Sequence, residues 1–175
     1  MNKLFLIVFG AFALCSCTVS VHTVYDKSID FTKYKTYCWM NGCEFKFEGP
    51  NYLKDSLLRE NLKASIIEEL KRKGLSLDPG NPDLLVGITV TVKDEKAIIY
   101  HHTEDQPFYR PMENNNNDVV TYLKGTLVLG MADRRESKIV WESFAVNYME
   151  IEPDFSEKRI HKGIQLVLKN YPPKK

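Results

Sequence analysis

The spacing of apolar residues predicts two helices. The clearer pattern lies in residues 53–70, where leucine or isoleucine recurs every three or four positions and charged residues take the other face. Gly74 follows the basic last turn as a left-handed cap, with Leu75 placed for an apolar contact. The apolar positions are Leu53, Leu57, Leu58, Leu62, Ile66, Ile67 and Leu70, and the polar ones are Asp55, Arg59, Glu60, Lys63, Glu68 and Glu69.

A second helix is predicted after Pro153, and Pro172 and Pro173 mark its end. Its apolar positions again repeat every three or four residues and would form one buried stripe. They are Ile160, Ile164, Val167, Leu168 and Tyr171.

Alternating and β-branched segments predict the strands. Residues 84–93 alternate between Val or Ile and small or polar residues, as expected of a strand with one buried face. The best hairpin candidate joins residues 122–133 to residues 138–148 through a polar connection. Two further strands are predicted near the start, at Val19 to Tyr25 and Tyr34 to Met40, and residues 97–100 either continue or return the strand before them.

These elements follow the order β-β-α-β-β-β-α and show no internal repeat. Strands grouped with two helices predict an α+β fold, in which an antiparallel β-sheet carries both α-helices on one face. Residues 17–175 would form this single domain. Residues 101–118 contain two prolines and four consecutive asparagines, and we expect them to form an exposed mobile loop.

The first residues are typical of a bacterial lipoprotein signal peptide. Lys3 precedes an uninterrupted apolar run from Leu4 to Leu14, which is too short to span a membrane. The next residues form a lipobox-like sequence that ends at Cys17, so residues 1–16 would be cleaved and Cys17 would carry the lipid anchor. A plain secretion signal is the alternative. Thr18, rather than Asp, resembles a signal for the outer membrane, where the domain would face the periplasm.

The charge balance argues against a nucleic-acid partner. The chain has 24 Lys and Arg residues and 23 Asp and Glu residues, and Lys3 lies in the segment expected to be removed. Proteins that bind nucleic acid need an excess of basic residues to neutralise phosphates. A hydrophobic content of 43% in 175 residues is instead typical of a single globular domain.

Two cysteines remain after the expected cleavage. Cys38 and Cys43 flank an Asn-Gly turn, and an oxidising compartment would allow a disulfide between them. Two free thiols are the alternative. The spacing does not match a redox C-x-x-C motif, and no second cysteine pair completes a structural zinc site.

Several blocks of residues along the chain form a recognisable series. They are Asp30 to Tyr37 with Trp39, Glu69 to Gly74, Pro82 to Val86, Gly125 to Val128 with Asp133, Ile139 to Trp141, and Tyr171 to Pro173. In order and spacing these blocks resemble domain-of-unknown-function family 4136, a family of bacterial lipoproteins. The usual aromatic-Ala-Trp of the family reads Tyr37-Cys38-Trp39 here. The resemblance implies an envelope lipoprotein with an α+β domain and no established activity.

Linear motifs for catalysis are absent from the sequence: it has no nucleophile elbow, phosphate-binding glycine loop, dinucleotide fingerprint or H-E-x-x-H pattern. The cluster of His101, His102, Glu104 and Asp105 could bind a divalent metal only weakly, because adjacent side chains on an extended chain point to opposite faces. A solvated polar loop is the simpler interpretation.

Other candidate residues fit structural roles. Asp30, Asp83 and Asp133 lie at turns or strand ends, where an aspartate side chain commonly caps backbone N–H groups. The strand aromatics are expected in the core rather than in a ligand groove. They are Tyr34, Tyr37, Trp39, Tyr122 and Trp141.

The sequence therefore favours a lipid-anchored, non-enzymatic envelope lipoprotein that binds a protein, lipid or glycan partner and needs no cofactor. One alternative is a periplasmic hydrolase or metal-binding protein that uses the His101 and His102 loop. The other is a structural subunit of an envelope complex.

Overall fold

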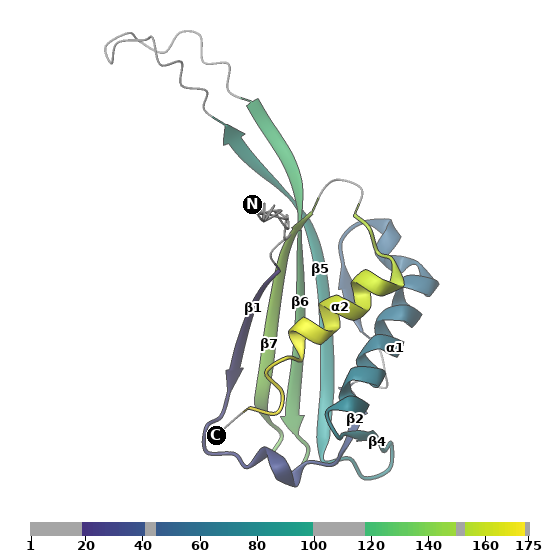
Figure 1. Cartoon of the computed structure of the whole chain (residues 1–175), viewed down its shortest axis with the longest axis vertical. Helices are drawn as coiled ribbons and strands as arrows, with labels where there is room; N and C mark the ends of the chain where they lie inside the picture. Colours follow the sequence, from purple (N-terminus) through teal and green to yellow (C-terminus); the bar gives the residue numbers. More distant parts are fainter. Residues whose placement is uncertain (1–18, 41–44, 100–117, 150–152, 174–175) are drawn as a thin grey trace, which may run out of the picture.

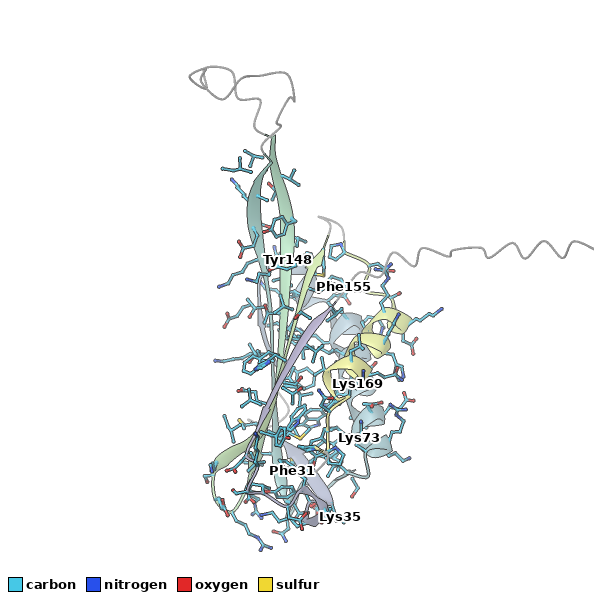
Figure 2. The ribbon with its side chains drawn as sticks, turned by 60° about the vertical axis from the view of Figure 1, so that its left-hand side comes forward. Phe31, Lys35, Lys73, Tyr148, Phe155 and Lys169 are labelled. Carbon is cyan, nitrogen blue, oxygen red and sulfur yellow. The ribbon has the colours of Figure 1, made fainter. Side chains whose placement is uncertain are left out.

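The computed structural model describes residues 19–40, 45–99, 118–149 and 153–173. These residues form one seven-stranded sheet and two α-helices, and both helices pack against the same face of the sheet (Figures 1 and 2). The predicted α+β fold is therefore confirmed. Among the described residues, no helix is both long and apolar enough to cross a membrane.

Three long strands form the centre of the sheet. They are β5 (Leu84–Ile99), β6 (Asp118–Asp133) and β7 (Lys138–Met149), each antiparallel to the next. Residues 134–137 connect β6 to β7, which confirms the predicted hairpin. The apolar stretch that begins at Ala97 continues β5 rather than returning as a separate strand, because the alternation from Leu84 is not interrupted by a turn.

The edges of the sheet differ from the sequence prediction. On one side β1 (Ser20–Tyr25) pairs antiparallel with β7, whereas on the other side β2 (Thr36–Trp39) and β3 (Lys46–Glu48) run parallel to β5. The short β4 (Ser76–Leu77) is parallel to β2. The sheet is mixed rather than entirely antiparallel because the first helix carries the chain back between β2 and β5, and such a crossover joins parallel strands.

The first helix, α1, spans Ser56–Arg72, and the side chain of Asp55 caps it by accepting a hydrogen bond from the Leu58 N–H at 2.8 Å. Its predicted end is confirmed, since Gly74 has a φ of 88° and Leu75 is buried. Leu53, predicted as the first apolar position of this helix, lies instead in a separate 3₁₀ turn, Asn51–Lys54. Two side chains within α1 also depart from the predicted pattern. Leu57 is 63% exposed, although the adjacent Leu58 packs against a core cluster, and Glu69 is buried.

Glu69 tolerates burial because the Arg72 guanidinium, one turn along α1, donates two hydrogen bonds to its carboxylate, at 2.8 and 2.9 Å. A buried charge needs such a partner.

The second helix, α2, spans Glu157–Val167 and packs beside α1 over the sheet. Its predicted apolar stripe lies in the main core. Tyr34, Tyr37, Trp39 and Trp141 are buried in the same core, as predicted, whereas Tyr122 is only half-buried and lies outside it. The most completely buried members are Trp141, Tyr37, Ile66, Leu70, Leu84, Leu129, Met131, Ile164, Leu168, Val86 and Val140. A second, smaller core holds Leu53, Val92 and Leu123.

Candidate functional site

The paired ends of β5 and β6 project beyond the rest of the sheet (Figure 1). The pairing of β6 with β7 ends at Leu123 and Met149, whereas β5 and β6 continue to pair as far as Ile99 and Asp118. We call the two-stranded portion, residues 95–99 and 118–122, the arm. Its five residue pairs give it a length of roughly 16 Å at the usual strand rise.

The arm exposes apolar side chains on both faces. Ile98 and Val119 are directly opposite each other on the two strands and are 53% and 60% exposed. Val120 pairs with Ala97 on the alternate face and is also exposed. An isolated two-stranded ribbon is only marginally stable in water, and contiguous exposed apolar residues often mark an interaction surface. The arm is therefore a candidate binding surface.

The base of the arm is tied to the body of the domain. The rings of Tyr122 and Tyr148 meet edge to face with centroids 5.4 Å apart, and Figure 2 shows Tyr148 below the arm. Lys124 forms an ion pair with Glu95 at 3.8 Å, and its ammonium lies 6.0 Å from the Tyr148 ring. These contacts and the smaller core below them fix the direction in which the arm projects.

A second candidate lies at the edge of the sheet. A groove of about 570 Å³ runs between β1 and the segment that follows α2. We call it the edge groove. One wall is formed by Val21, His22, Thr23 and Tyr25, and the other by Lys169, Asn170, Pro172 and Pro173.

A polar cluster lies at the opposite end of the sheet from the arm. Asp133 is buried and accepts hydrogen bonds from the Tyr34 hydroxyl at 2.8 Å and from the backbone N–H groups of Arg135 and Glu136. The ammonium of Lys33 lies 3.4 Å from the same carboxylate. Burial alone would raise the pKa of Asp133, but these donors outweigh it and the pKa is lowered.

Asp83 plays a similar role beside this cluster. Its carboxylate accepts hydrogen bonds from the backbone N–H groups of Lys35 and Thr36 at 2.8 and 3.0 Å, which lowers its pKa despite partial burial. Asp30 caps the turn that follows it by accepting from Thr32. The predicted capping roles of Asp30, Asp83 and Asp133 are confirmed: Asp30 and Asp133 accept from the turns that follow them, and Asp83 accepts from backbone N–H groups at the start of β2.

The other predicted site residues fall mostly outside the described chain. Cys17, Cys43, His101, His102, Glu104 and Asp105 all lie there, so their predicted roles stay predictions. Cys38, the other half of the predicted disulfide, is half-buried in β2. Within the described ranges, no group of three or more His, Cys, Asp and Glu residues is arranged to hold a metal ion.

Sequence reasoning did not identify either candidate surface. For the arm, the available signal was the pair of apolar stretches that flank the polar residues 100–117, at 97–99 and 119–120. If both stretches extend the paired strands, their apolar side chains outnumber those that the rest of the domain can cover. For the edge groove no local signal exists, because its two walls are more than 140 positions apart in the sequence.

Comparison with known proteins places the chain in a family. Residues 21–173 match the family model described as a domain of unknown function, DUF4136. The chain belongs to the DUF4136 family. No curated protein matches it.

Solved structures share the fold of this DUF4136 chain at low sequence identity. A PDZ domain protein from Parabacteroides distasonis ATCC 8503 superposes with a TM-score of 0.57 and 18% identity over 89% of this chain. That alignment covers only 36% of the PDZ domain protein. PelC from Paraburkholderia phytofirmans, solved as a dodecamer, superposes with a TM-score of 0.52 and 8% identity, and the alignment covers 90% of this chain and 100% of PelC.

Proposed function

We propose that this protein is a lipid-anchored lipoprotein of the bacterial cell envelope and that its domain is a non-catalytic binding or assembly module. The observation that carries the proposal is the arm, whose exposed Ile98, Val119 and Val120 are covered by no element of the described chain. A two-stranded ribbon with apolar residues on both faces gains stability when a partner covers it.

The proposed anchor would hold the domain close to the membrane. Only three residue steps separate Cys17 from Ser20, the first residue of β1. An extended chain covers at most about 11 Å over that distance. On this proposal the lipid attaches at Cys17 and the domain stands in the periplasm at the outer membrane.

The arm favours one specific form of this proposal, in which the domain assembles into a larger envelope complex. A projecting ribbon can reach past the body of its own domain to a neighbouring molecule. The shared fold with PelC supports this form because that fold is compatible with a dodecamer. Contact with a different envelope protein would use the same arm surface.

Two measurements test the proposal. Intact mass of protein recovered from membranes should show acylated Cys17, and a Cys17→Ser variant should lose both the added mass and membrane retention. A photo-crosslinking residue at Val119 should give a discrete adduct in intact cells, whereas the same residue at exposed Lys158 of α2 should not. An unmodified chain would overturn the anchor, and absence of an adduct at Val119 would overturn the role of the arm.

A further inference from the structure

The outer edge of β1 lacks the features that normally prevent strand pairing. Its six residues, SVHTVY, include no lysine, carboxylate or proline, and they pair with β7 in continuous register from Ser20 to Tyr25. Exposed edge strands are usually protected by charges, prolines, bulges or short length. At the opposite edge, β4 has only two residues. The β1 edge is therefore a ready template for another strand.

The pairing pattern shows which backbone groups face outward. The Asp26 N–H donates to the Val140 carbonyl at 3.0 Å, which sets the alternation of hydrogen-bonded pairs along this antiparallel ladder. Since hydrogen-bonded pairs alternate, the even-numbered residues of β1 bond to β7. The N–H and C=O groups of Val21, Thr23 and Tyr25 then point away from β7, and no backbone partner for them exists in the described chain.

The same three residues line the edge groove. Their side chains point toward the helical side of the sheet, where Val21 and Tyr25 pack at the margin of the core. Asn170, in the opposite wall, donates to the Thr23 hydroxyl at 3.3 Å. A strand added to β1 would place alternate side chains into this groove while its backbone bonds to the exposed edge.

The charge of the groove indicates the chemistry of the added strand. Lys169 lines the groove, and none of the described residues that line it is an aspartate or glutamate. Lys73 brings a second ammonium to this wall, because its Nζ donates to the Lys169 carbonyl at 3.3 Å. Figure 2 shows Lys169 and Lys73 on the helical side of the sheet. A carboxylate in the added strand would complement these charges.

We propose that the edge groove receives an extended, acidic peptide segment of a partner protein, which adds as a strand to β1. A second copy of this chain fits less well, because β1 itself carries no acidic residue and a symmetric pair would bring two Lys169 side chains together. This inference rests on the proposed binding function and names a partner chemistry for it.

The test uses two synthetic peptides of eight residues that alternate threonine and valine, one with a central aspartate and one with a central lysine. Binding to the folded domain is followed by the backbone amide signals of Val21, Thr23 and Tyr25. We expect the aspartate peptide to shift these signals and to bind about fivefold more tightly than the lysine peptide. Lys169→Ala should remove that preference, whereas Lys162→Ala, which replaces an exposed lysine of α2, should not.

Two further variants test the backbone contact. Thr23→Pro removes an outward N–H without removing a bond to β7, so it should abolish peptide binding. A peptide methylated on alternate backbone amides should also fail to bind, and this control leaves the protein unchanged. No shift at β1, binding that survives amide methylation, or protection of β1 that depends on protein concentration would each overturn the proposal. None of these results would affect acylation of Cys17 or crosslinking at Val119.

Discussion

At the scale of single residues, two polar side chains buried in the sheet have contrasting surroundings. Asp133 accepts hydrogen bonds from Tyr34 and from two backbone N–H groups, with Lys33 beside it. The Ser143 hydroxyl is fully buried on β7, and no described residue forms a hydrogen bond with it. Because desolvation destabilises a polar group that lacks a partner, the two side chains should respond oppositely to substitution.

Replacing Asp133 should destabilise the domain. Asp133→Asn removes the charge that faces Lys33 and gives the Tyr34 hydroxyl and two backbone N–H groups a weaker acceptor. We expect the free energy of unfolding to fall by about 1–3 kcal/mol, as measured by urea denaturation. Tyr34→Phe, which removes one donor and keeps the carboxylate, should cost less. Equal free energies of unfolding for the wild type and Asp133→Asn would show that the charge of Asp133 contributes nothing to stability.

Replacing Ser143 should leave the domain as stable or make it more stable. Ser143→Ala removes a fully buried hydroxyl and keeps the small size of the side chain. The free energy of unfolding should stay unchanged or rise by up to about 1 kcal/mol. Ser143→Val is the matched overpacking control and should be destabilising, because Ser143 lies opposite Leu129 in a close-packed sheet. A loss of stability in the alanine variant would reveal a hydrogen bond to the Ser143 hydroxyl.

At the scale of elements, the sequence pattern was sufficient to predict a helix, strand or turn wherever the buried positions follow the periodicity of that element. The helix cap at Gly74, the apolar stripe of α2 and the hairpin at residues 134–137 could all be predicted, because each depends on neighbouring residues. The parallel pairing of β2 and β3 with β5 could not, since it depends on where α1 returns the chain. Burial of Glu69 likewise depends on how α1 packs, although its partner Arg72 lies only one turn along the same helix.

The arm should tolerate polar substitution while losing its binding role. Ile98 and Val119 are both more than half exposed, so a variant with Ile98→Thr and Val119→Thr should change the free energy of unfolding by less than about 0.5 kcal/mol. Crosslinks from the neighbouring position Val120 should be lost in this variant. The matched control, Ile88→Thr in the buried part of β5, should instead destabilise the domain. Unchanged crosslinking in the double variant would contradict the role assigned to the arm.

Hydrogen exchange provides an independent measurement on the same element. Arm amides at residues 95–98 and 119–122 lack a third strand and a helix above them, so they should exchange faster than those of residues 84–92. Addition of the crosslinked partner should slow exchange in the arm selectively. Equal protection along β5 without a partner would show that the arm is stable by itself.

At the scale of the whole molecule, the stability of the domain should fall at acidic pH. Hydrogen bonds and ion pairs lower the pKa values of Asp26, Asp83 and Asp133 in the folded state. An aspartate whose pKa is lower in the folded state stabilises the fold at pH values above its unfolded-state pKa of about 3.9. This stabilisation is lost as the pH falls toward the folded-state pKa. We therefore expect a constant unfolding free energy from about pH 7 to 5 and a decline below about pH 4. Asp133→Asn should reduce the steepness of that decline.

The fold class could be predicted from the order and periodicity of the elements, whereas the two candidate surfaces arise only in three dimensions. The edge groove joins Val21 to Lys169, and no local pattern relates these residues. The arm depends on β7 ending at Met149 while β5 and β6 continue, which is a difference in strand length rather than a motif. Composition and capping residues therefore predict the fold of the domain better than they predict its candidate interaction surfaces.

The position of β1 also determines how the domain would carry mechanical load. A lipid at Cys17 would pull on the chain three residues before Ser20, the first of six consecutive pairs between β1 and β7. Tension directed along the strand loads those pairs together in shear, so they resist as a unit. Tension directed across the sheet would open them one at a time, beginning at Ser20. The domain should consequently withstand a pull along β1 far better than a sideways pull.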